Sequence, residues 1–180
     1  VQIPDPLIGG PQAGTLSVDF RFLRSLDAPE TVALARTSTP NPNTTVGGTF
    51  GTFYPAAARG GGVRSKAVIP SLTQNASVRS NLAVVHLGGG SELPLEVELR
   101  LYRAADGAPA GNPLRKTLQP GDWFQWSGVI QQAGALADGS EMVGVVTRLS
   151  GDDTFFAYGV LNDAITSDGS YLKMIVADEF

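Results

Sequence analysis

Apolar and polar residues alternate along most of this chain, with the two-residue period that is typical of half-buried β-strands. The clearest case is PLEVELRLY (residues 94–102), where Val97, Leu99 and Leu101 alternate with charged residues. The same pattern predicts about ten strands in all, the others lying in residues 16–23, 31–37, 49–55, 66–70, 77–87, 114–119, 122–126, 141–150, 154–162 and 170–177.

Helical periodicity is nearly absent from the sequence. The only candidate is a turn or two in SGVIQQAGAL, which begins at Ser127. The chain is rich in Gly (22) and Pro (12), which favour tight turns between short strands. An all-β, antiparallel sandwich is therefore predicted, and a parallel α/β fold is not.

The beginning and the end of the chain look alike. Residues 20–56 can be aligned with residues 145–177, so that Phe50 corresponds to Tyr171 and Ala33 to Ala157. Both segments read as a strand, an acidic turn, a second strand, a polar loop, Gly-(Thr/Ser)-aromatic and a third strand. This repeat predicts a three-strand half-module that precedes one complete module, with uncovered apolar surface and sheet edges.

The order of motifs in the second part of the chain adds a resemblance. The motifs are the strand Arg79–Leu82, the turn Asp106-Gly107, the turn Pro120–Trp123, the strand Phe156–Tyr158 and the loop Asn162-Asp163. Together they resemble the Ig-like β-sandwich modules that occur in tandem in large secreted or cell-surface bacterial proteins. The resemblance covers about residues 66–177, and more loosely 15–58. It implies an antiparallel Ig-like sandwich, an extracellular or cell-surface location, and a structural or adhesive role without catalytic residues.

These observations predict three parts of the chain. Residues 1–58 would hold an extended segment and the half-module, residues 59–65 a Gly-rich linker, and residues 66–180 the complete Ig-like module. Uncovered strand edges favour partners that are copies of the same chain or adjoining modules, and head-to-tail strand pairing would give a filament. The proline-rich residues 1–14 are a candidate strand donor, and the beginning of the sequence is interpreted as that of a mature or excised chain.

Charge and composition narrow the classes of function. The net charge of −4 argues against nucleic acid as the main partner. There is no cysteine, so thiolate metal sites and thiol nucleophiles are excluded. No apolar run approaches 18 residues, and we therefore expect no membrane insertion.

Residues that could carry chemistry all have simpler structural interpretations. His86 is the only histidine, and we expect it to end a strand without a metal or catalytic role. Loop oxygens between Asn162 and Asp168 leave calcium open, although turn formation alone explains them. A hydrolase would need a carboxylate pair, and the candidates are Glu92, Glu96, Glu98, Glu141, Asp152 and Asp153. We predict no enzyme activity and no cofactor.

Both tryptophans lie in GDWFQW, and they are the candidate ligand-binding residues. Trp123 and Trp126 fall on opposite faces if the strand is regular, so one should be in the core and the other on the surface. The surface ring could stack on a sugar or fill a subunit interface. The preferred interpretation is a non-enzymatic extracellular structural or adhesive protein, and the alternative is a carbohydrate-binding module that uses exposed aromatic residues.

Overall fold

The structure is a computed structural model of the 180-residue chain. The predicted strand 16–23, the proposed strand donor 1–14 and Glu92 lie outside the residues that the structure describes. The described residues are 33–40, 45, 47–57, 61–88, 93–163, 166 and 168–177.

Within these residues the protein is all-β, with antiparallel sheets and one short helix, as predicted. In chain order the elements are β1 (Leu34–Pro40), β2 (Thr49–Pro55), β3 (Lys66–Leu72), β4 (Val78–His86), β5 (Leu95–Arg103), β6 (Pro109–Leu118), β7 (Trp123–Trp126), α1 (Val129–Gln132), β8 (Met142–Ser150), β9 (Phe155–Asp163), β10 (Gly169–Lys173) and β11 (Ile175–Val176). In the described part of the chain, no helix is long and apolar enough to cross a membrane.

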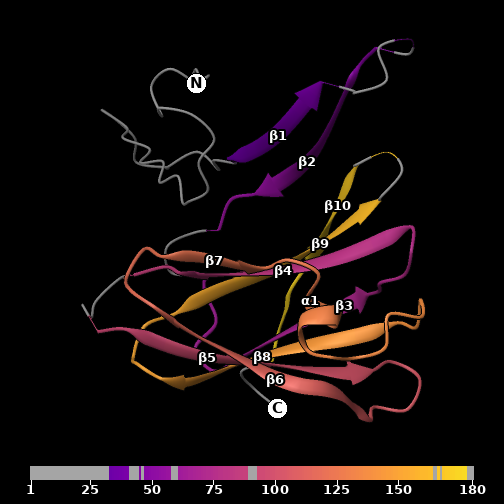
Figure 1. Ribbon diagram of the computed structural model, residues 1–180. Coiled ribbons are helices and arrows are strands. Elements are labelled where there is room, and N and C mark those ends of the chain that lie inside the picture. Colours follow the sequence, from indigo (N-terminus) through magenta and orange to yellow (C-terminus); the bar gives the residue numbers. More distant parts are fainter. Residues whose placement is uncertain are drawn as a thin grey trace, which may run out of the picture.

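Two sheets form a sandwich-like pair of layers, and a separate hairpin lies outside them (Figure 1). We call the sheet with strand order β10-β9-β4-β7 the upper sheet, and the sheet with order β11-β3-β8-β5-β6 the lower sheet. The hairpin β1-β2 is the third sheet and has only two strands. The chain passes between the two layers several times, for example from β3 to β4 and from β8 to β9, and both sheets share one core.

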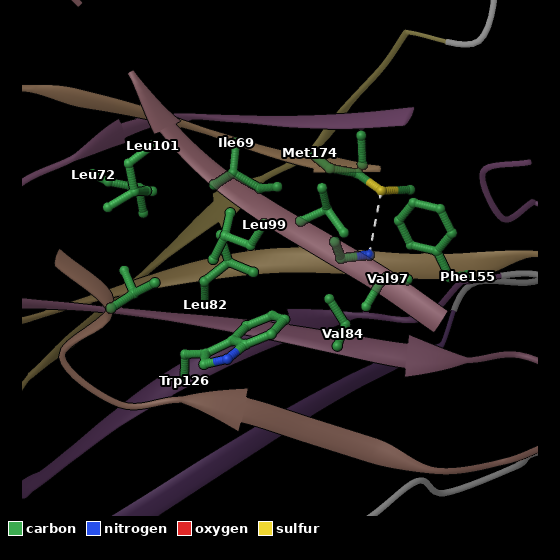
Figure 2. Close-up of a cluster of buried hydrophobic side chains, with 14 of the residues drawn as sticks. Ile69, Leu72, Leu82, Val84, Val97, Leu99, Leu101, Trp126, Phe155 and Met174 are labelled. Carbon is green, nitrogen blue, oxygen red and sulfur yellow. Dashed lines mark hydrogen bonds between the residues drawn. The ribbon is translucent and has the colours of Figure 1, made fainter. Parts of the chain in front are cut away.

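Alternating apolar residues from both sheets fill this core (Figure 2). Leu82 and Val84 of β4 face Leu99 of β5 across it, and each of the three is at most 1% exposed. Trp126 and Phe155 add the largest rings. Burial of such side chains stabilises a fold by about 1.5–3 kcal/mol each, so period-two patterning supplies most of the driving force here.

The C-terminal strand differs from its prediction, because residues 170–177 form two strands instead of one. β10 pairs with β9 in the upper sheet, and β11 pairs with β3 in the lower sheet. Met174, between them, points into the core and is 7% exposed. Its sulfur accepts a hydrogen bond of 3.5 Å from the Ala157 N–H (Figure 2). The chain changes sheets at this residue, and local periodicity cannot signal such a change.

The Gly-rich segment before β3 is partly packed. Val63 is fully buried, and it exchanges two backbone hydrogen bonds with Phe155, of 2.7 and 3.0 Å. A Cβ on Gly62 would lie 2.6 Å from Leu87 Cδ1, so the backbone approaches that side chain closely. Val63 therefore contributes to the core, while the division of the chain at 59–65 stays a prediction.

Glu98 shows where the alternating pattern needs a correction. It lies on the outer face of β5, as its position predicts, but it is only 6% exposed. Its Oε1 accepts a 2.6 Å hydrogen bond from Arg100 Nε, and its Oε2 accepts one of 2.9 Å from Arg115 Nε. These hydrogen bonds hold the pKa of Glu98 below its usual value of 4.5, against the opposing effect of burial.

We expect Glu98→Gln to lower the free energy of unfolding at pH 7 by about 1 kcal/mol, because the two arginines are largely exposed and screened. A lowered pKa stabilises the fold above pH 4.5, and this stabilisation is lost as the pH falls through the folded-state pKa. Thermal unfolding between pH 7 and 3 should therefore show the two proteins converging in acid. A difference that is constant with pH would contradict this assignment.

Candidate functional site

His86 is buried at the end of β4. It is 1% exposed and lies on the core side of β4. Its Nδ1 accepts a 3.0 Å hydrogen bond from the Gly88 N–H, and its Nε2 lies 3.3 Å from the Leu93 carbonyl oxygen. Both nitrogens thus have backbone partners, which fits a tautomer that donates from Nε2.

Among the candidate carboxylates that the structure describes, Glu98 and Glu141 have partners in the local structure. Among the described residues, no group of three or more His, Cys, Asp and Glu side chains is placed to hold a metal ion. Glu98 binds two arginines, and Glu141 accepts a 2.9 Å hydrogen bond from Ser71 Oγ. Asp163 Oδ1 accepts the Thr166 N–H within its own turn, at 2.8 Å. These carboxylates are used by local structure.

The two tryptophans lie on opposite faces of β7. Trp126 pairs with Leu82, is 3% exposed, and meets the Phe124 ring edge-on at a centroid distance of 5.2 Å. Its ring is therefore not accessible to a ligand. Trp123 pairs with Val85 on the outer face of the upper sheet and is half-buried. Its Nε1 donates a 3.0 Å hydrogen bond to the Tyr158 hydroxyl.

An aromatic cluster covers this outer face, and we take it as the candidate functional site. Tyr158 stacks on Tyr171 of the neighbouring strand, with centroids 5.6 Å apart and planes at 27°. Phe156 lies beside Tyr158, with centroids 6.3 Å apart. The strands β7, β9 and β10 present these rings because alternate residues of a strand point to the same side. The members are Trp123, Phe156, Tyr158 and Tyr171.

The hairpin β1-β2 packs onto this cluster. Tyr54 of β2 meets Tyr158 edge-on at 5.5 Å and Tyr171 at 6.2 Å. Thr52 is 6% exposed and lies so close to Gly169 that a Cβ there would overlap the threonine Oγ1. Asp168 Oδ1 accepts a 3.2 Å hydrogen bond from the Gly51 N–H. The contact is thus both apolar and hydrogen-bonded.

The phenols in this contact are shielded from water. Burial raises the pKa of Tyr171 to about 12, and the neighbouring Tyr158 adds to the effect. Burial also raises the pKa of Tyr158, which the hydrogen bond from Trp123 partly offsets. Within the described residues, the Tyr171 hydroxyl is buried without a hydrogen-bond partner. Such groups suit packing between two surfaces and offer no activated nucleophile or base.

We expect Tyr171→Phe to leave the stability at pH 7 unchanged or slightly higher, because it removes a buried hydroxyl without a partner. A group whose pKa is raised in the folded protein contributes stability that is fully present below the unfolded-state pKa of 10. This contribution is lost as the pH rises toward the folded-state pKa of about 12. The variant should therefore lose less stability than the parent between pH 10 and 12, measured by urea unfolding. An equal alkaline loss would show that Tyr171 is exposed.

Sequence reasoning found Trp123 but missed its tyrosine neighbours. A signal was present, because Phe156 and Tyr158 alternate in FFAYGV and Tyr171 belongs to the repeated Gly-(Thr/Ser)-aromatic motif. The pattern assigned these residues to a face, but not to a contact with Tyr54.

A shallow hollow of about 460 Å³ lies at one end of the upper sheet. It is lined in part by Gln74, Asn75, Arg79 and Asp163. Asn75 Oδ1 accepts the N–H groups of the following turn, and Gln74 Nε2 donates to Gln131, so these polar side chains serve the fold.

No protein-family model, curated protein or solved structure matches the chain, and the interpretation of the aromatic contact therefore rests on its own residues.

Proposed function

We propose that this chain is a non-enzymatic, extracellular structural or adhesive protein built from tandem Ig-like β-sandwich modules, and that it associates with copies of itself or with adjoining modules. The observation that carries the proposal is the aromatic contact between the hairpin β1-β2 and the sandwich. Tyr54 packs on Tyr158 and Tyr171, although β2 shares no sheet with them. A sandwich surface that packs against a hairpin outside its own two sheets is suited to packing between modules.

The repeat supports this interpretation through its register. In each hairpin, the aromatic residue of the Gly-(Thr/Ser)-aromatic motif pairs with the residue eleven positions earlier, Phe50 with Thr39 and Tyr171 with Val160. In this register Ala33 corresponds to Thr154, not to Ala157. The hairpin β1-β2 is thus the counterpart of β9-β10, which would close the preceding module.

Strand order supports an Ig-like relationship for the central strands. In Ig domains, strand B pairs with E in one sheet, and C pairs with F and C′ in the other. Here β4 pairs with β7, and β5 pairs with β8 and β6, which is the same pattern. The outermost strands differ, because β3 lies beside β8 and β9 beside β4. The first and last Ig strands would thus have exchanged places.

The test is the size and shape of the native particle. We expect the full chain to form particles larger than one chain by light scattering, and elongated ones by negative-stain electron microscopy. A chain that lacks residues 1–14 should lose this assembly if that segment donates a strand to a neighbour. Deletion of residues 178–180 is the matched control. A monomer at every concentration tested would contradict self-association.

A carbohydrate-binding role is the second candidate, and half-buried Trp123 on the outer face favours it. The accessible part of such a ring is suited to stacking on a sugar. Pulldown on insoluble polysaccharides should then succeed with the parent protein and fail with Trp123→Ala, while Thr117→Ala, at an exposed position of β6 in the lower sheet, should behave as the parent does. Absence of binding to every polysaccharide would remove this candidate.

A further inference from the structure

The hairpin β1-β2 has a second face, which carries exposed apolar residues. Leu34 is 66% exposed and Phe53 is 58% exposed. They lie on the side opposite Thr52 and Tyr54, because neighbouring residues of a strand point to opposite faces. Arg36 lies over the Phe53 ring, 5.6 Å from its centroid, and this contact covers only part of the apolar surface. We call Leu34, Arg36 and Phe53 the outer hairpin face.

The counterparts of these residues are buried in the complete sandwich. When the alignment of Phe50-Thr39 with Tyr171-Val160 is extended along both segments, Leu34 corresponds to Phe155 and Phe53 to Met174. Phe155 is fully buried and Met174 is 7% exposed, both within the core. The outer hairpin face is therefore the core face of the repeated unit, displayed without the opposing layer.

In the complete sandwich, the opposing layer is the lower sheet, and one of its strands immediately precedes the hairpin. β8 ends at Ser150, a short turn follows, and β9 begins at Phe155 in the other sheet. Val146 of β8 is fully buried in the same core cluster as Phe155 and Met174. The strand just before this hairpin thus belongs to the layer that covers its apolar face, and in that layer β3, the neighbour of β8, lies nearest to β9 and β10.

The first hairpin is preceded by a segment of matching pattern. We propose that residues 16–23 of the same chain cover the outer hairpin face, as the lower sheet covers β9 and β10. The inference deepens the proposed tandem-module function and rests on it. In this segment Leu16, Val18, Phe20 and Phe22 alternate with polar residues. The structure describes the chain from residue 33, directly before β1, so residues 16–23 precede the hairpin by only a few positions. Residues 24–32 are long enough to form the turn that would connect residue 23 to β1.

Cysteine cross-linking tests the proposal cleanly, because the parent chain contains no cysteine. The test variants combine Phe53→Cys with Val18→Cys or with Phe20→Cys, and they are equilibrated in a glutathione redox buffer. We expect at least one of them to form an intramolecular disulfide several-fold more than two controls. The first control combines Phe53→Cys with Asp19→Cys, and the second combines Thr37→Cys, on the other hairpin face, with Phe20→Cys.

Non-reducing electrophoresis and peptide mass mapping read the result. Disulfides that form only between two chains would overturn covering within one chain, while they would leave self-association intact. Equal yields in test and control variants, or no disulfide at all, would also overturn the proposal. The particle size of the parent chain is measured separately, so failure of the tandem-module function is distinguishable from failure of this inference.

Discussion

Replacing Trp126 by alanine is expected to lower the free energy of unfolding by about 3–5 kcal/mol, the range for removal of a large ring from a packed core. Trp126 is 3% exposed and belongs to the core cluster that both sheets share. The cavity would open beside Leu82 and Phe124, which are held in place by their own strands and can close it only in part. Urea unfolding followed by far-UV circular dichroism measures the loss.

Trp123→Ala is the matched control on the same short strand. It removes one hydrogen bond to Tyr158 and a half-buried ring from the outer face, and we expect a loss of about 1 kcal/mol. The contrast follows from two tryptophans three residues apart that lie in different environments. Equal losses in the two variants would mean that the outer face is as well packed as the core.

Gly169→Ala is expected to lower stability by about 1–3 kcal/mol and to displace the hairpin β1-β2 from the sandwich. A Cβ at Gly169 would overlap Thr52 Oγ1, and such overpacking is usually relieved by movement. The cheapest movement is a shift of the hairpin, because β2 is not paired with β10 in a sheet. Hydrogen exchange of the β2 amides should become faster, and the near-UV signal of Tyr54 should change.

Two further variants separate this effect from general damage. Thr52→Ala removes the overlapping oxygen, so the double variant with Gly169→Ala should regain most of the lost protection. Ser170→Ala changes the neighbouring, exposed residue of the same strand and should leave hydrogen exchange unchanged. Parental protection of β2 in Gly169→Ala would show that the hairpin does not rest on Gly169.

If the hairpin contact is the junction between modules, variants of this contact should act on assembly more than on the sandwich itself. The sandwich core lies on the other side of the upper sheet from Tyr54 and Tyr171. Loss of the contact would thus free the modules from each other while each keeps its own core.

Local pattern predicted much of this protein from the sequence. The strand Thr49–Pro55 was predicted at its observed bounds, the helical turn after Ser127 is present, and the two tryptophans lie on opposite faces. Period-two alternation was sufficient here because it depends only on neighbouring residues, and burial of one face makes the register costly to change. The all-β class follows from the same cause.

Only the tertiary structure determined which surface of the protein packs against each strand face. It placed Trp126 inside and Trp123 outside, buried Glu98 beneath Arg100 and Arg115, and changed sheets at Met174. It also brought Tyr54 onto the aromatic cluster. Alternation indicates that the two faces of a strand differ in polarity. The partner of each face is determined by long-range packing, which brings together residues more than a hundred positions apart.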